Sequence, residues 1–193
     1  MELTTDIIKQ LRDATGVSVM QCKKALEEAG GDLAKAEVIL RRRSAEASEK
    51  KEGRELGAGA IGSYVHEGTI GAMVQLACET DFVARNPDFA ALARELAMQV
   101  AATDPKYVDV NGIPAEAKSA ATAVFEKEIA DKQGAMRAKI LEGKLTSYFS
   151  DQVLMDQPFI KDETKTVRDL VNAATQKFGE RVQVAHFARL SAR

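Results

Sequence analysis

The chain has 193 residues, of which 45% are hydrophobic and 29% are charged, and its formal net charge is −2. This composition excludes a disordered chain, and the slight negative charge argues against a protein that coats nucleic acid. Two cysteines exclude a disulfide framework, and the sequence shows neither a membrane-spanning apolar run nor a signal-peptide pattern. We therefore expect a cytoplasmic protein with a buried core and no membrane partner.

Residues 4–40 carry the pattern of three short helices. Gly16 and Gly30–Gly31 separate them, and glycine is typical just past the end of a helix. Asp32 is placed to cap the third helix. Because three helices this short bury little surface, we expect a minimal, closely packed module over residues 1–41.

Residues 42–58 are expected to form a charged linker. From 41 to 56, six basic side chains stand against four acidic ones, which leaves a local charge of +2. Glu46 and Lys50 are four residues apart in the orientation that stabilises a helix. A solvated helical linker and a nucleic-acid-binding arm both fit this segment, and the near balance of charge favours the linker.

From residue 59 onward the pattern changes to that of β-strands. Two apolar stretches flank Glu67–Gly68, which is a plausible hairpin turn. Asn86–Asp88 then has the features of a helix start, with asparagine as cap and proline at the first helical position. The pattern predicts that this helix ends at Asp104–Pro105.

Two further helical stretches, Ala115–Lys132 and Ala135–Gln152, are predicted to form a helical hairpin hinged near Gly134. Residues Asp156–Phe159 are predicted to be a loop.

A capping-box pattern at Thr166–Asp169 opens another helix, which Gly179 closes. Arg181–Leu190 has the pattern of a third strand. Strands at both ends of a helical stretch predict an α+β domain over residues 59–193, in which a small antiparallel sheet is packed with helices.

A search for catalytic motifs finds none. Gly57–Gly62 is glycine-rich, but it leads into a strand pattern and lacks the Lys-Ser/Thr ending of a phosphate-binding loop. The soft ligands are scattered without the spacing of a zinc site: Cys22, Cys78, His66 and His186. Because no nucleophile motif is visible either, the sequence predicts a protein that acts by binding, with no cofactor or metal of its own.

The segment Cys78–Pro87 is the most informative part of the chain. It lies between a strand pattern and a helix start, so Asp81 and Phe82 sit at a junction with polar neighbours. Burial of a Phe side chain is worth roughly 1.5–3 kcal/mol, enough to anchor a partner. Two interpretations stay open: Phe82 binds a partner, or it folds back into the chain's own core.

Several motifs resemble those of bacterial translation elongation factor Ts. The heptad Thr80–Asn86 carries most of the resemblance, which extends over nearly the whole chain. Four further motifs match: Leu11–Gly16, Cys22–Leu26, Gly62–His66 and Gln157–Phe159. By their order and combined coverage, the chain is identified as a member of the elongation factor Ts family.

The resemblance implies a guanine nucleotide exchange factor, not an enzyme. Such a factor binds the GTPase elongation factor Tu with GDP, promotes GDP release and is displaced by GTP. Its three N-terminal helices would form a ubiquitin-associated-like module that rests on the GTPase domain. The segment tied to magnesium dislocation corresponds to Thr80, Asp81, Phe82 and Val83, with Phe82 inserted between helices near the bound magnesium. For Asp81, an action near the metal and a cap on the next helical turn both stay open.

The resemblance adds Val19, Met20 and His66 as further partner contacts. The family usually has two methionines where this chain has Val19 and Met20, so Val19 is a departure. Longer members carry two related core subdomains and this chain carries one, so it resembles the short members that work as homodimers. The resemblance thus implies a 2:2 complex, with the sheet or the last strand near Phe187 as dimer surface.

Two rival functions fit parts of the sequence. The N-terminal module would suit an adaptor for some other protein, but an adaptor has no use for the heptad Thr80–Asn86. Residues 41–55 would suit an RNA-binding factor, but the net charge of the chain speaks against direct nucleic-acid binding.

Overall fold

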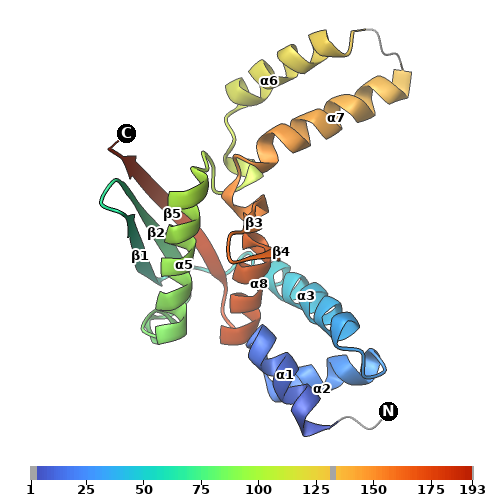
Figure 1. The fold of residues 1–193 in the computed structure, drawn as a ribbon, viewed down its shortest axis with the longest axis vertical. Helices are drawn as coiled ribbons and strands as arrows, with labels where there is room; N and C mark the ends of the chain where they lie inside the picture. The colour runs from blue at the N-terminus through green and yellow to red at the C-terminus, as the bar shows by residue number, and fades with distance from the viewer. Residues whose placement is uncertain (1–3, 131–133, 193) are drawn as a thin grey trace.

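The computed structural model describes residues 4–130 and 134–192. Figure 1 shows the N-terminal helices at one end, a sheet with helices packed beside it, and a helical hairpin that projects from the other end. The predicted α+β class with a small antiparallel sheet is confirmed. The outermost residues of the predicted domains 1–41 and 59–193, namely 1–3 and 193, lie outside the described part. No helix within that part is both long and apolar enough to cross a membrane.

The N-terminal helices are α1 (Thr5–Thr15), α2 (Val19–Glu28) and α3 (Leu33–Glu49). Gly16, with a φ of 68°, ends α1 in the left-handed conformation. The Asp32 carboxylate accepts a hydrogen bond of 3.1 Å from the Lys35 amide and so caps α3. The three helices enclose a separate small core, as the sequence predicted: Leu11, Val17, Cys22, Ala25, Leu26, Ala36 and Leu40.

Helix α3 is longer than predicted. It passes residue 41 without a break and ends at Glu49, because neither glycine nor proline interrupts it and the Arg42–Glu46 pair, 3.7 Å apart, supports it. The expected linker 42–58 is thus helical in its first half and turns afterward. The clustered arginines are paired within the chain: Arg42 and Arg43 with Glu28, and Arg41 with Asp169. This pairing supports the linker interpretation of the segment.

The main sheet has three antiparallel strands in the order β1-β2-β5: β1 (Ala58–His66), β2 (Ile70–Cys78) and β5 (Val182–Ser191). Glu67 and Gly68 turn the chain between β1 and β2 with φ values of 46° and 69°. Two successive positive φ values suit the twist of a tight hairpin. The predicted hairpin and the predicted final strand are both confirmed.

Helix α5 (Pro87–Thr103) covers one face of this sheet. It begins where predicted, and the Asn86 side chain accepts a hydrogen bond of 2.9 Å from the Asp88 amide. Helix and strand approach unusually closely at Gly62. A Cβ atom there would lie 2.1 Å from the carbonyl carbon of Ala93, so only glycine fits.

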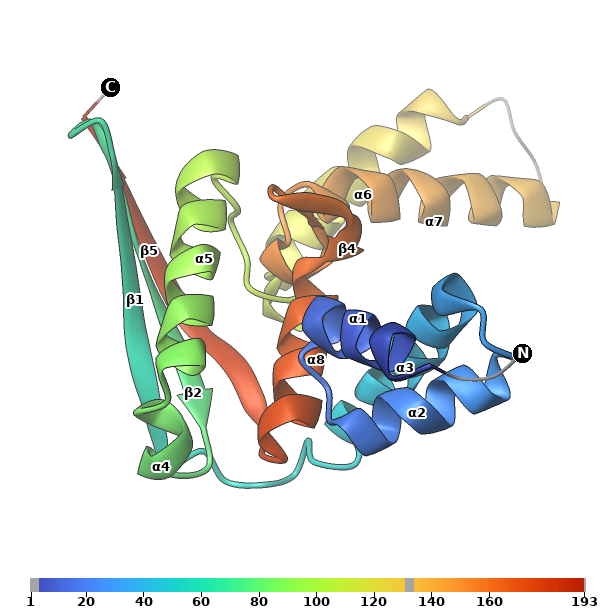
Figure 2. The same ribbon diagram turned by 60° about the horizontal axis from the view of Figure 1, so that its bottom comes forward.

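Within the described residues, no helix covers the other face of the sheet. Figure 2 shows α5 on one side of the strands and no described helix on the other. The exposed face carries apolar side chains from all three strands: Ile61, Val65, Met73 and Leu190. The register places Val65 and Leu190 on either side of Gly71, so these side chains form one patch across the sheet.

The segment predicted to be a loop at Asp156–Phe159 is partly a strand. A short strand β3 (Pro158–Phe159) pairs with β4 (Asp162–Thr166). That prediction was wrong because two residues give no alternating pattern. The buried Gln157 side chain accepts hydrogen bonds from Gln99 Nε2 at 3.1 Å and from the Thr103 hydroxyl at 2.7 Å, and these bonds attach the hairpin to α5.

Helix α8 (Val167–Phe178) follows β4 and lies between the sheet and α3 (Figure 2). Its start is the predicted capping box, in which the Thr166 hydroxyl and the Asp169 carboxylate bind each other's amides. Gly179, with a φ of 71°, ends it and turns the chain toward β5. The main core lies between α8, α5 and the inner face of the sheet.

Helices α6 (Ala115–Glu128) and α7 (Gly134–Ser150) form the projecting hairpin in Figure 1, as predicted, although the predicted end at Lys132 lies outside the described residues. Two turns of 3₁₀ helix flank it: η1 (Val110–Gly112) and η2 (Leu154–Asp156).

Arg168 on α8 fixes the base of this hairpin. Its guanidinium donates hydrogen bonds to Asp109 at 2.8 Å and to Asp156 at 2.7 Å. Burial raises the pKa of Asp109, but the hydrogen bonds from Arg168 and from the Asn111 amide, together with the charge of Arg168, lower it below its ordinary value.

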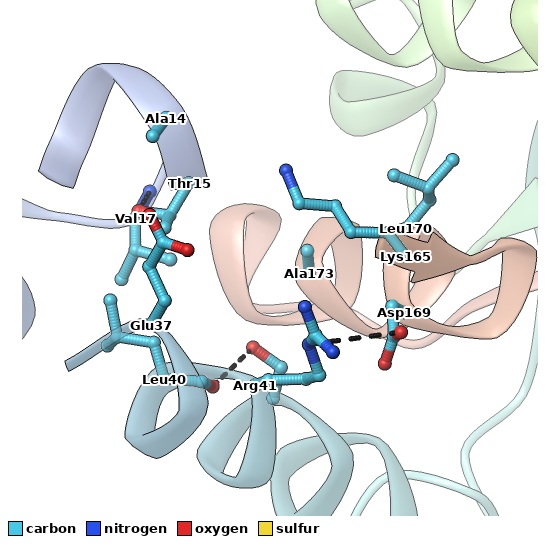
Figure 3. A pocket seen from close by; sticks show the side chains of 11 residues that line it. Ala14, Thr15, Val17, Glu37, Leu40, Arg41, Lys165, Asp169, Leu170 and Ala173 are labelled. Carbon is cyan, nitrogen blue, oxygen red and sulfur yellow. Dashed lines mark hydrogen bonds and ion pairs between the residues drawn. The ribbon is translucent and has the colours of Figure 1, made fainter. Parts of the chain in front are cut away.

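The N-terminal helices contact the core mainly through α3 and α8. Figure 3 shows Arg41 reaching across to Asp169, at a distance of 3.9 Å, and the Ser44 hydroxyl donates to Gln176 nearby. A cavity of about 110 Å³ remains between the two helices. It is smaller than the about 300–1,000 Å³ of ligand pockets, so we interpret it as a packing defect.

Candidate functional site

The segment Thr80–Val83 forms a tight turn between β2 and α5. Residues Asp81–Ala84 make the four-residue helix α4, and Thr80 precedes it in extended conformation. Val83 is 3% exposed and faces the core, whereas Phe82 is 81% exposed. Because neighbouring residues of a helix point in directions about 100° apart, burial of Val83 directs Phe82 outward. The interpretation in which Phe82 folds back into its own core is therefore wrong.

Asp81 is the first residue of α4 and not its cap. Its carboxylate forms an ion pair with Arg85, one turn later, at 3.0 Å. The cap of the following helix is Asn86. A carboxylate and an apolar ring thus stand side by side on an exposed turn of the chain.

Thr80 is held by a residue a hundred positions away. Both its amide and its hydroxyl donate to the Glu180 carboxylate, at 3.0 Å and 2.6 Å. The Cys78 thiol donates to the Thr80 carbonyl at 3.2 Å, and burial raises the pKa of this thiol. Thr80 therefore has little freedom on the side from which the chain enters α4.

The neighbouring residue Glu79 contacts the same distant segment, but as the hydrogen-bond acceptor. Its carboxylate accepts a hydrogen bond from the amide of Arg181 and forms an ion pair with Arg54 at 3.2 Å. The hydrogen bond from Arg181 holds the pKa of Glu79 below its ordinary value, and Arg54 contributes in the same direction. Glu79, Glu180 and Arg181 are parts of the site that the sequence pattern does not indicate, because residues so far apart give no local signal.

Val19 and Met20 lie together at the start of α2. They are 54% and 69% exposed, directly after Ser18, whose hydroxyl accepts a hydrogen bond of 3.4 Å from the Gln21 amide. Figure 2 shows the start of α2 and α4 on the same side of the molecule. One flat or concave partner surface can therefore face both elements.

His66 is not brought to this group. It ends β1, whereas Thr80 follows the end of β2 that pairs with Ala58. The strand between Ala58 and His66 has nine residues, which at about 3.3 Å per residue places the two ends roughly 26 Å apart. The His66 ring instead lies 3.1 Å from the Tyr64 hydroxyl. The structure thus joins Thr80, Asp81, Phe82 and Val83, and places His66 at the far end of the sheet.

The site does not resemble a metal centre. In residues 4–130 and 134–192, no group of three or more His, Cys, Asp and Glu side chains is arranged to hold a metal ion. Cys22 and Cys78 are free and buried in separate cores.

The sequence matches the model of a protein family described as Elongation factor TS over residues 2–192. The chain belongs to the elongation factor Ts family. Elongation factor Ts of Thermotoga petrophila is 47% identical over 190 residues, which are 98% of this chain and 96% of the relative. Those of Thermodesulfovibrio yellowstonii and Coprothermobacter proteolyticus are 44% and 42% identical, over 98% of this chain and 96% and 98% of each relative. The predicted family is therefore confirmed, and it is a family of translation factors.

Most motifs that indicated the family serve the fold. Leu11, Cys22 and Leu26 are buried in the N-terminal core, Gly62 contacts α5, and Gln157 is hydrogen bonded inside the main core. Thr80–Val83 differs because it carries Phe82, the most exposed large apolar side chain among these motifs, at 81%. Among the quoted motifs, this segment is therefore the best candidate for contact with a partner.

Proposed function

We propose that this chain is a guanine nucleotide exchange factor for elongation factor Tu in translation elongation. It acts in the cytoplasm by binding and performs no covalent chemistry. Membership in the elongation factor Ts family supports the role. The observation that carries the mechanism is the 81% exposure of Phe82 on a turn whose neighbours are fixed.

In this mechanism Phe82 enters the GTPase domain near its bound magnesium. GDP is held largely through its phosphates, whose charge the magnesium ion and the loop amides neutralise. A ring that moves the magnesium ion and the groups around it away from the phosphates removes part of that stabilisation, so GDP leaves faster. Burial of the ring contributes roughly 1.5–3 kcal/mol to this insertion. Asp81 acts beside it, near the metal.

Displacement by GTP follows from the same coupling. If the factor weakens nucleotide binding by some ratio, nucleotide must weaken binding of the factor by the same ratio. Incoming GTP therefore expels the factor and completes the cycle. Val19 and Met20 make a second contact with the GTPase domain. This contact increases the affinity of the complex and does not act on the bound GDP.

The test is release of fluorescent GDP from purified elongation factor Tu in a stopped-flow instrument. We expect Phe82→Ala to slow stimulated release at least tenfold, which corresponds to about 1.4 kcal/mol. Val38→Ala, which removes an exposed apolar side chain from α3, is the control and keeps the normal rate. An unchanged rate in Phe82→Ala would refute the insertion of the ring.

A second copy of this chain is proposed to cover the exposed sheet face. The patch of Ile61, Val65, Met73 and Leu190 spans all three strands and is apolar enough for a lasting contact. A two-fold pair of sheets would bury it on both copies. The separation of His66 from Phe82 also supports a dimer, since two protomers can then contact different parts of one GTPase.

This assembly would be a 2:2 complex, in which one protomer supplies Asp81 and Phe82 and the other reaches the β-barrel domains of the GTPase. Size-exclusion chromatography with light scattering at low micromolar concentration measures the oligomeric state. A clean monomer would contradict the dimer and leave the role of Phe82 untouched.

A further inference from the structure

The residues after α8 and the residues before α4 hold each other in a reciprocal clamp. Glu180 accepts two hydrogen bonds from Thr80, and Glu79 accepts one from the Arg181 amide. The Arg181 side chain also donates to the Arg54 carbonyl. Two adjacent residues on each segment thus bind two adjacent residues on the other.

The clamp acts where α4 most needs support. A helix of four residues is unstable alone, because it fixes several dihedral angles for very few hydrogen bonds. On the far side, Val83 and the Asn86 cap hold the chain. On the near side, Thr80 is fixed through both its backbone and its side chain by one carboxylate. Charge-assisted bonds of this kind are about twice as strong as neutral ones.

We propose that Glu180 is a positioning residue for nucleotide exchange, which fixes Thr80 so that the ring of Phe82 is presented to the partner in one orientation. This inference rests on the proposed function. A ring that is already oriented loses less conformational freedom on insertion, so the transition to the inserted state is faster.

The last turn of α8, just before Glu180, also lies near both partner-facing elements. Lys177, in the last turn of α8, pairs with Asp88 at the start of α5 at 2.8 Å. Its side chain also lies against Gly16, where a Cβ atom would be 3.5 Å from Lys177 Cδ. Gly16 precedes α2 and the exposed Val19. The end of α8 therefore contacts the supports of both α4 and α2.

The first experiment measures exchange on elongation factor Tu with Glu180→Ala and Glu180→Gln. We expect a five- to tenfold loss for Glu180→Ala. A smaller loss is expected for Glu180→Gln, whose amide oxygen still accepts from one Thr80 donor. The substitution should lower the maximal rate of GDP release more than it raises the half-saturating concentration of the factor. Glu163→Ala, which removes an exposed glutamate from β4, is the matched control. Normal exchange in both Glu180 variants would overturn the proposal.

A double-mutant cycle separates positioning from a direct contact. If Glu180 acts through the ring, Glu180→Ala should cost less than twofold in a Phe82→Ala background. The same five- to tenfold loss in both backgrounds would show that Glu180 acts independently and would overturn the proposal.

Hydrogen exchange on the free chain gives a readout without the partner. We expect the amides of Thr80–Ala84 to exchange faster in Glu180→Gln, with those of β2 unchanged. Unchanged protection of the Thr80 amide would overturn the clamp, even where Glu180→Ala does not fold. If the Phe82→Ala variant stimulates GDP release from elongation factor Tu at the normal rate, the proposed function fails. The hydrogen-exchange measurement still decides whether Glu180 fixes the turn.

Discussion

Two exposed apolar surfaces of this chain differ in construction. Phe82 is one ring on a four-residue helix, and Thr80, which precedes this helix, donates two hydrogen bonds to Glu180, a hundred residues away. The outer sheet face presents four apolar side chains on a regular ladder of backbone bonds. The first is a point contact held by a few side-chain hydrogen bonds, and the second is a broad surface held by a backbone ladder.

This difference matches two kinds of binding. A single ring contributes roughly 1.5–3 kcal/mol, which a competing nucleotide can offset. A stable interface between copies buries about 1,200–2,000 Å² in total and is not reversed by one small ligand. We therefore propose that the ring serves the transient step and the sheet the permanent assembly, and the following variants test that division.

The largest effect is expected at the sheet. Val65→Asp places a charge in the patch and should weaken the proposed dimer at least a hundredfold, about 2.7 kcal/mol. Val38→Asp on α3 is the control, since both valines are 65% exposed. Sedimentation over a range of concentrations measures the dissociation constant. Equal constants for the two variants would mean that the sheet is not the dimer surface.

A smaller, conditional effect is expected at Asp81. Asp81→Ala should slow GDP release about three- to fivefold at high magnesium and less at low magnesium, because its proposed role is beside the metal. Arg85→Ala breaks the same ion pair and is the control for the stability of α4. An Asp81→Ala defect that does not change with magnesium concentration would remove the link to the metal.

Met20 should affect the affinity for elongation factor Tu and not the maximal rate of GDP release. Met20→Ala is expected to raise the half-saturating concentration of the factor about threefold, roughly 0.7 kcal/mol of lost apolar contact, with the maximal rate unchanged. Titration of elongation factor Tu in the stopped-flow assay measures both quantities. A lower maximal rate would place Met20 with Phe82 in the release step.

The smallest effect concerns the base of the helical hairpin. Arg168→Met should lower the melting temperature by about 2–4 °C at pH 7, the shift for roughly 1 kcal/mol in a chain of this size. The pKa of folded Asp109 lies below its ordinary value of 3.8, so its ion pair stabilises the fold above that pH. The stability is lost as the pH falls through the folded pKa.

The difference between Arg168→Met and the wild type should therefore shrink below pH 3.8. Lys161→Met, which breaks an exposed pair with Glu95, is the comparison and should have a smaller effect at pH 7. Melting followed by circular dichroism from pH 7 to pH 3 gives both curves. A difference that stays constant would assign the effect to packing and not to charge.

Local signals predicted the regular elements of this fold well. Glycine after α1 and α8, the Asn86 cap and the Thr166–Asp169 capping box each act within one helical turn, so the sequence displays them directly. The end of α3 was misjudged because the change from apolar to charged residues suggested a boundary. A helix needs no apolar residues to continue, only the absence of a residue that breaks it.

Contacts between distant segments were out of reach. Phe82 could be located at a junction, but its exposure depends on burial of Val83 and on Glu180, which is a hundred residues away. The strand β3 depends on pairing with β4 and on the buried Gln157 amide, not on its own two residues. The separation of His66 from Thr80 likewise appears only when the strands are paired.

Gly62 gives the molecule a fixed internal spacing. The backbones of β1 and α5 touch at this residue, with no room for even a methyl group. A larger residue would push α5 away from the strands, and the displacement would travel through Asn86 to the short helix before it. A buried glycine therefore helps to hold the benzyl group in place from about two turns of helix away.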